Sequence, residues 1–188
     1  MRLLVYGAVL AGSALIAAAS RAEDYALDDT HAGVNFKISH LGLSWTYGRF
    51  NDLAGAFRID PANPANSAFA LNIKSDSLDT NNKQRDDHLR GPDFFNTKQF
   101  PQISFKSTAI KAIDGGYEVT GDFSLRGVTK SITFPLKGGR TAEFPKGVLR
   151  TGFVTELGIK RSEFGLEKMV GPIGDEVFIS ISFEGVKK

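Results

Sequence analysis

The chain of 188 residues contains no cysteine. Disulfide bonds, a cysteine nucleophile and a lipid anchor on an N-terminal cysteine are therefore excluded. Small secreted domains often depend on disulfides because their hydrophobic cores are small, but a chain of this length can bury a sufficient core without them. The absence of cysteine is thus compatible with export, and it fits a bacterial periplasm better than a eukaryotic secretory route.

Histidine is also scarce, since His31, His40 and His88 are the only three in the chain. A metal site usually needs several histidines with carboxylates at close spacing. His31 and His40 would meet only if adjacent strand ends brought them together. The sequence therefore predicts no metal site, and no motif in it indicates a cofactor.

Long apolar runs are confined to the N-terminus. Arg2 precedes the apolar stretch Leu3 to Ala19, and Ser20-Arg21-Ala22 has the small-x-small pattern of a cleavage site. This is the order of a secretory signal peptide, so we expect residues 1–22 to be removed and residues 23–188 to form one mature periplasmic domain. The alternative is an uncleaved membrane anchor, which the glycine- and alanine-rich composition disfavours. No later stretch is apolar enough for a transmembrane helix.

An excess of one charge is missing as well. The whole chain has 23 basic and 21 acidic residues, and loss of Arg2 and Arg21 with the leader leaves 21 of each. No block of basic residues is present that would suggest a nucleic-acid surface. Nucleic acid is therefore excluded as a partner, while the oligomeric state, a homodimer included, stays open.

What the sequence does contain is period-two alternation, which is typical of strands with one apolar face. Apolar residues alternate with polar ones in six runs, and two further strands are expected at 49–60 and 148–159. The alternating apolar residues are Val34, Phe36 and Ile38; Phe69, Leu71 and Ile73; Ile103 and Phe105; Tyr117, Val119, Phe123 and Leu125; Ile132, Phe134 and Leu136; and Val177, Ile179, Ile181 and Phe183.

Glycine-rich turns separate these runs. Asp114-Gly115-Gly116 predicts a hairpin, and Arg126-Gly127 and Gly138-Gly139 are expected to end the next two strands. Residues 81–90 lack alternation, and Asn81 with Gln84 resembles a capping box, so this segment is expected to be a short helix. The sequence therefore predicts an all-β, antiparallel protein of about eight strands, closed into a barrel or folded into a sandwich, with one helix.

Five groups of residues from about Tyr25 to Val186 resemble, in order, the YceI-like family. They are Asp28-Asp29-Thr30-His31 with Val34, Phe36, Ile38 and His40-Leu41-Gly42; Tyr47-Gly48 with Phe50 and Gly55; Arg85 to Leu89 with Asp93-Phe94-Phe95 and Phe100-Pro101; Gly121-Asp122-Phe123 with Gly127 to Lys130; and Arg161-Ser162 with Phe164-Gly165. Ala32, Gly91-Pro92 and Phe123-Ser124 depart from the family pattern.

The resemblance implies a lipocalin-like, up-and-down barrel in the periplasm whose lumen holds a polyisoprenoid or another long-chain amphiphile, for transport or storage. An isoprenoid quinone or its precursor is one candidate ligand. Together with the alternation, it assigns a set of apolar residues to the lumen. This set consists of Val34, Phe36, Ile38, Trp45, Phe50, Phe57, Leu71, Ile73, Phe94, Ile103, Phe105, Val119, Phe123, Ile132, Phe134, Phe153, Phe164, Ile179 and Ile181.

The polar block Arg85-Asp86-Asp87-His88 admits two interpretations. It caps one end of the barrel, or it forms the acid–base group of an enzyme that acts on the lipid. Neighbouring residues such as Asp87 and His88 point to different faces of a helix, which is poor geometry for a catalytic pair. We therefore predict no catalytic residues and expect His40, Arg85, Asp86 and His88 near the lipid headgroup. A filled, purely structural barrel is the third alternative.

Overall fold

The computed structural model describes residues 22–188. The expected signal peptide, residues 1–22, therefore lies almost entirely outside the described residues. Within the described part of the chain, no helix is long and apolar enough to cross a membrane.

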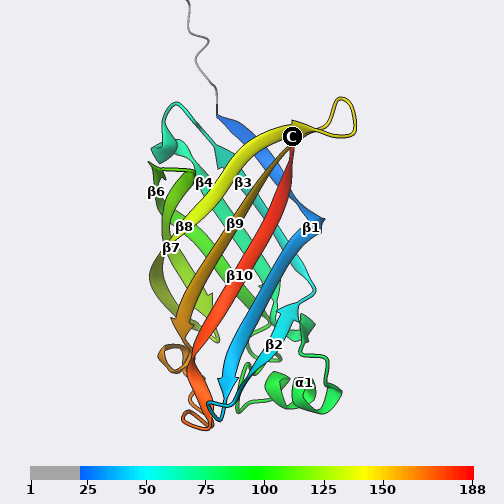
Figure 1. Ribbon diagram of the computed structural model, residues 1–188, viewed down its shortest axis with the longest axis vertical. Helices are drawn as coiled ribbons and strands as arrows, with labels where there is room; N and C mark the ends of the chain where they lie inside the picture. Colours follow the sequence, from blue (N-terminus) through cyan, green and yellow to red (C-terminus); the bar gives the residue numbers. More distant parts are fainter. Residues whose placement is uncertain (1–21) are drawn as a thin grey trace, which may run out of the picture.

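Ten strands make up most of the structure (Figure 1). They are β1 (Glu23–His40), β2 (Ser44–Phe50), β3 (Leu53–Ile59), β4 (Ala68–Lys74), β5 (Leu78–Asp79), β6 (Gln102–Ile113), β7 (Gly116–Leu125), β8 (Val128–Glu143), β9 (Leu149–Lys160) and β10 (Ile173–Lys187). The helix α1 spans Lys83–Arg90, and short 3-10 turns lie at Pro64–Asn66, Ser75–Ser77 and Arg161–Phe164.

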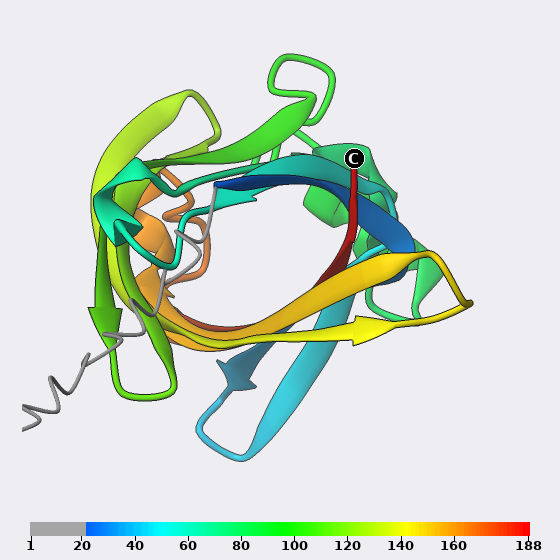
Figure 2. The ribbon, with the colours of Figure 1, turned by 90° about the horizontal axis from the view of Figure 1, so that it is seen from above.

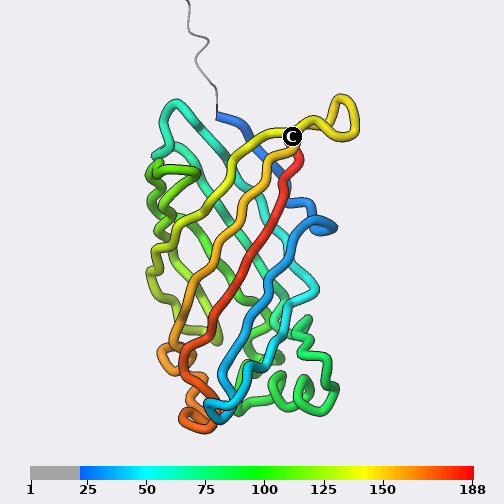
Figure 3. The backbone as a smooth tube through the Cα atoms, in the orientation of Figure 1, coloured from blue at the N-terminus to red at the C-terminus, as the bar shows by residue number. Residues whose placement is uncertain are grey.

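The sheet closes on itself. Neighbouring strands follow the order β10-β9-β8-β7-β6-β4-β3-β1, and β10 also pairs with β1, always antiparallel. Figure 3 shows the last strand running beside the first, and Figure 2 shows the resulting ring from above. The prediction of a closed antiparallel barrel of eight strands is confirmed. The strands β2 and β5 extend this barrel at its lower end.

The first strand changes its partner halfway along. The segment Glu23 to Ala26 pairs with β3, whereas Val34 to His40 pairs with β2. The register against β10 shifts between Asp28 and Gly33, and such a bulge bends a strand and increases its twist. As a result, the single strand expected at 49–60 is interrupted between β2 and β3. The lower half of β2 pairs with β1 on one side only, so the barrel wall is incomplete there.

Two local predictions need correction. Gly138 and Gly139 do not end a strand, because β8 continues through them as a bulge opposite Phe153. The helix cap is Asn82, whose side-chain oxygen accepts a hydrogen bond from the backbone N–H of Arg85, while Asn81 has a positive φ. The predicted hairpin at Asp114-Gly115 is confirmed, with Gly115 at a φ of 73° as such turns require.

Candidate ligand-binding lumen

The barrel encloses an elongated cavity of about 330 Å³. On β10 the lining residues run from Ile173 to Phe183. At about 3.3 Å per residue this is roughly 33 Å along the strand, or about 25 Å along the barrel axis at the usual strand tilt. Nearly all of the lining is apolar. The space therefore suits a long, narrow, apolar molecule.

Three phenylalanine rings approach glycines of the wall closely. A Cβ atom built on Gly48 would meet the ring of Phe36 at 2.3 Å, one on Gly121 the ring of Phe105 at 2.5 Å, and one on Gly185 the ring of Phe57 at 2.3 Å. At Gly48 the three nearest atoms all belong to the Phe36 side chain. Glycine at these places lets large rings lie along the wall, which preserves the width of the lumen.

The upper end of the lumen, next to the C-terminus in Figure 1, is filled by aromatic rings. Phe57 stacks on Tyr25 at 5.1 Å and on Phe69 at 5.5 Å between ring centroids. Phe153 contacts Phe57, Phe69 and Phe183 at 5.5–5.7 Å. Tyr25 and Phe153 are only 2% exposed. This cluster closes the barrel at that end.

Polar lining residues gather at the lower end. His40, Thr46, Arg85 and Arg161 border the cavity there. His40 and Thr46 belong to the hairpin of β1 and β2, and Arg85 belongs to α1, so they flank the place where the wall is incomplete. His40 and Arg85 are exposed to solvent. The mouth of the lumen therefore lies between this hairpin and α1.

Arg161 fastens the loop that follows it. Its guanidinium is buried and donates hydrogen bonds to the carbonyl groups of Gly174 at 2.8 Å, Lys168 at 2.9 Å and Ile173 at 3.3 Å, and also to that of Leu166. Burial lowers the pKa of this guanidinium from its ordinary value, and the charge of Asp175 opposes that shift. The arginine thus fixes the 166–174 loop beside the mouth.

The residues of the Arg85 to His88 block point in different directions. Arg85 donates to the hydroxyl and carbonyl oxygens of Thr80, both at 2.7 Å. The buried Asp86 accepts from the backbone N–H of Thr80 at 2.9 Å and from its hydroxyl. Asp87 pairs with Lys83 at 2.5 Å on the solvent side, and the exposed His88 lies 3.6 Å from Asp93. Asp87 and His88 therefore form no acid–base pair in this structure.

The cavity also lacks an acid–base partner of its own. None of its lining residues within 22–188 is aspartate, glutamate or lysine. The buried hydroxyl of Thr155 is already committed, since it donates to the carbonyl of Pro135 at 2.6 Å. The arrangement can bind an apolar chain, and its polar groups at the mouth can meet a headgroup.

All but three of the predicted lumen residues line the cavity, the exceptions being Trp45, Phe153 and Phe164. Trp45 points outward and is 44% exposed, because on β2 it is Thr46, Gly48 and Phe50 that face inward. Phe153 is enclosed by the upper aromatic cluster. Phe164 packs edge-on against Phe123 below the strands. Of the residues expected near a headgroup, His40 and Arg85 line the mouth, whereas Asp86 and His88 do not.

The set of residues predicted for the lumen omits several that line the cavity. These include Leu27, Thr46, Phe69, Leu89, Phe95, Leu125, Leu136, Thr155, Leu157, Ile159, Arg161, Leu166, Ile173, Val177 and Phe183. Thr155, Leu157, Ile159 and Arg161 follow one another at a spacing of two on and just after β9. This spacing of two could have identified the inward face of β9 from the sequence. The run was overlooked because it begins and ends with a polar residue, Thr155 and Arg161.

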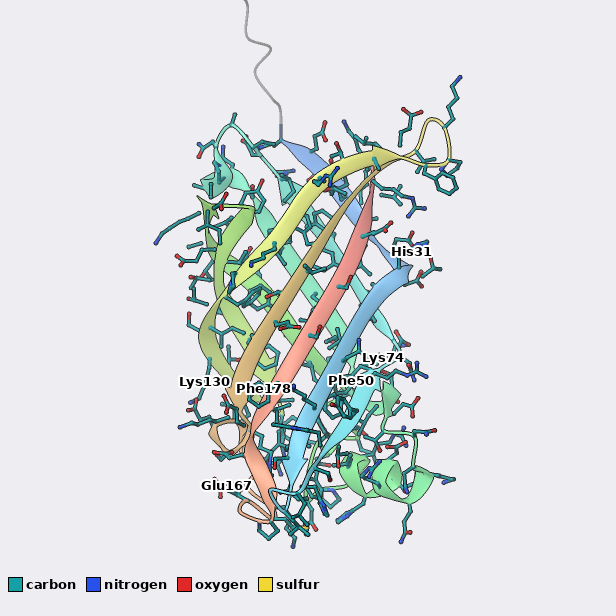
Figure 4. The ribbon with its side chains drawn as sticks, in the orientation of Figure 1. His31, Phe50, Lys74, Lys130, Glu167 and Phe178 are labelled. Atoms are coloured by element: carbon teal, nitrogen blue, oxygen red, sulfur yellow. The ribbon has the colours of Figure 1, made fainter. Side chains whose placement is uncertain are left out.

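A second polar cluster lies far from the mouth, at the bulge of β1. Ligand atoms of Asp28, His31 and Glu184 lie within 4.8 Å of one another. However, the guanidinium of Arg150 contacts Asp28 and lies 3.4 Å from Glu184. One guanidinium already pairs with both carboxylates, so the cluster is a salt-bridge network. His31, labelled in Figure 4, lies at this bulge, whereas His40 is the last residue of β1, so the two histidines do not converge.

Comparison with known proteins adds three findings. The YceI-like domain family matches residues 25–185. The protein YceI of Escherichia coli is 40% identical over 190 residues, covering all of both chains. The crystal structure of BcnA from Burkholderia cenocepacia superimposes with a TM-score of 0.77 at 27% identity, over 84% of this chain and 98% of that one.

A more distant structure shares the fold. It is described as a polyisoprenoid binding domain from Saccharophagus degradans implicated in plant cell wall breakdown. It superimposes with a TM-score of 0.66 at 20% identity, over 87% of this chain and 98% of that one. At this identity the likeness concerns the architecture of the barrel.

Proposed function

Since this chain belongs to the YceI-like family, we propose that it is a periplasmic binding protein that holds a polyisoprenoid or similar long-chain amphiphile in its lumen. The observation that carries the proposal is the elongated apolar cavity of about 330 Å³, closed above by aromatic rings and bordered below by polar groups. The description of the Saccharophagus degradans domain as polyisoprenoid-binding supports the same class of ligand.

The energetics favour such a ligand. Each methylene group that leaves water for an apolar lumen gains about 0.8 kcal/mol. A chain of several isoprene units therefore needs few polar contacts to bind tightly. His40 and Arg85 at the mouth are placed to meet a hydroxyl, phosphate or quinone headgroup. The protein would act in transport or storage, because the lumen offers no acid–base pair for chemistry on the lipid.

The periplasmic part of the proposal rests on the leader. Residues 1–22 have the charged, apolar and small-residue order of a signal peptide. N-terminal sequencing of the exported protein is expected to begin at Glu23. A mature protein that retains Met1 would contradict this part without affecting the lipid-binding part.

The direct test of ligand identity is mass spectrometry of an organic extract from the protein purified from its native periplasm. We expect a long-chain amphiphile in near-stoichiometric amount. Protein denatured and washed before extraction serves as the control for lipid adsorbed to the surface. Repeated purification of an empty barrel in detergent-free buffer would contradict the proposal.

A further inference from the structure

Large apolar side chains exposed to solvent are concentrated at the lower end of the barrel. Leu43 is 83% exposed and Tyr47 64%, and a group of such side chains is more informative than any single one. The members of this apolar end, as we term it, are Leu41, Leu43, Trp45, Tyr47, Met169, Val170 and Phe178. Phe178 and Glu167 mark its position in Figure 4.

All members of the apolar end except Phe178 belong to two adjoining segments, and neither segment contains a formally charged residue. The hairpin segment 38–48 has no aspartate, glutamate, lysine or arginine, and the same is true of the loop 169–174. The two segments are joined, because the backbone N–H of Leu41 donates to the carbonyl of Pro172 at 2.7 Å and His40 pairs with Ile173. The exposed apolar side chains of the two segments therefore belong to the same end of the barrel.

The apolar end borders the mouth of the lumen. His40, Thr46 and Ile173 line the cavity from the same two segments whose outer sides carry Trp45, Tyr47 and Met169. In Figure 2 the hairpin of β1 and β2 flares away from the ring of strands. A molecule leaving the lumen at this end therefore emerges directly beside the exposed leucines.

Charged residues flank the uncharged segments. Lys37 and Arg49 stand at the two ends of the hairpin, Lys168 directly precedes the loop and Asp175 follows it. Arg49 pairs with Asp79 at 3.0 Å, and Lys168 lies 3.6 Å from Asp93. The ammonium of Lys37 lies 4.9 Å from the ring centre of Trp45 and 5.4 Å from that of Phe178. Among the described residues, no carboxylate forms an ion pair with Lys37. Its charge therefore remains available to an anionic partner.

We propose that the apolar end docks on a phospholipid bilayer with anionic headgroups, so that lipid passes between membrane and lumen without crossing water. The order of groups fits the depth profile of a membrane interface, with leucines at the tip, tryptophan and tyrosine behind them, and a lysine behind these. The inference rests on the proposed function, since a polyisoprenoid is insoluble and resides in membranes.

The chain carries its own probe for this contact. Trp45 is the only tryptophan of the protein and lies on the apolar end. Vesicles of phosphatidylcholine with added phosphatidylglycerol are expected to shift its emission to the blue, and acyl-brominated lipid is expected to quench it. Unchanged emission at saturating vesicle concentration would refute the docking. A blue shift that needs no vesicles and follows dimer formation would assign the surface to a second copy and would equally refute it.

A pair of variants tests the surface itself. Leu43→Ser is expected to weaken binding to these vesicles about tenfold, because the leucine no longer enters the interface. Val154→Ser is the matched control, since Val154 is 51% exposed on the outer face of β9, away from the apolar end. Vesicle flotation measures both. Equal binding by the two variants would contradict the inference.

The failure of docking can be distinguished from the failure of lipid binding. In the first assay, each variant is loaded from detergent micelles, and the amount of bound lipid is measured after gel filtration. In the second assay, the rate at which each variant takes up lipid from vesicles is measured. We expect Leu43→Ser to take up the same amount from micelles as the unmodified protein but to load from vesicles about tenfold more slowly. Empty barrels in both assays would contradict the proposed function. Equal loading rates from vesicles with normal uptake would contradict the docking alone.

Discussion

At the upper end of the barrel, aromatic rings pack against one another, whereas at the lower end the lining side chains remain partly accessible from the lumen. Phe153 is 2% exposed among Phe57, Phe69 and Phe183, while Phe36, Ile179 and Val177 are only half-buried. Both ends follow the same period-two pattern. The lower end has a buried cluster of its own, which includes Val34, Phe94 and Leu166, so the difference concerns the lumen wall around Phe36, Val177 and Ile179, which borders the cavity.

The largest expected effect is at the packed end. Phe153→Ala removes a ring that contacts at least three others and should destabilise the protein by about 3–5 kcal/mol. Ile179→Ala, in the half-buried wall of the lumen, should cost less than half as much, because its side chain already borders empty space. Urea unfolding measures both. Equal losses in the two variants would remove the distinction between the ends.

The next effect concerns the loop beside the mouth. Arg161→Met keeps the approximate length of the side chain but removes four hydrogen bonds to backbone carbonyl groups, so we expect a loss of about 2–3 kcal/mol. Arg161→Lys should restore part of this stability. Hydrogen exchange is expected to show the damage in residues 166–174, with the upper end unchanged. Uniform loss of protection would mean that the mouth and the core unfold as one unit.

A smaller effect on stability is expected at low pH, where Asp28 becomes protonated. Hydrogen bonds from Thr30, the ion pair with Arg150 and the contact with His31 hold the pKa of Asp28 well below its ordinary value. A carboxyl group whose pKa is lower in the folded state stabilises the fold above its unfolded pKa of about 4, and this contribution is lost as the pH falls towards the folded pKa.

Asp28→Asn should therefore reduce stability at neutral pH and flatten its decline below about pH 4. Other carboxyl groups with lowered pKa values, such as Asp60 and Asp175, will keep part of the slope. Thermal unfolding between pH 7 and pH 2 measures this dependence. Asp114→Asn, in the exposed turn between β6 and β7, is the control. An identical slope for both variants would assign no role to the Asp28 network.

The smallest change in stability, under about 1 kcal/mol, is expected for Gly48→Ala, which should instead alter the bound lipid. Gly48→Ala displaces only the Phe36 ring, which must then turn into the lumen. The extracted lipid is expected to become shorter or less abundant, with the circular dichroism spectrum unchanged. Gly33→Ala is the control, because a Cβ there meets its nearest neighbour at an ordinary 3.7 Å. The same lipid in all three proteins would mean that the chain does not pass Phe36.

The sequence by itself determined the strands, their antiparallel order and most of the lumen. Period-two alternation placed Phe36, Phe105 and Ile179 on inward faces, and the structure has them there. The glycine at position 115 likewise predicted the hairpin turn, because the turn needs a residue with a positive φ and glycine adopts one readily. These features depend on residues adjacent in the chain, so a single sequence suffices to predict them.

Only the tertiary structure decided which face of β2 meets the lumen and how deeply each ring is packed. Trp45 lies outside because β2 pairs with β1 in a register that turns Thr46 inward, and no residue of β2 alone specifies that register. Phe153 is enclosed because strands distant in sequence bring Phe57, Phe69 and Phe183 around it. Arg161 lines the cavity because a folded-back loop supplies its four carbonyl partners. Alternation specifies which side chains share a face, but the closure of the barrel specifies what that face contacts.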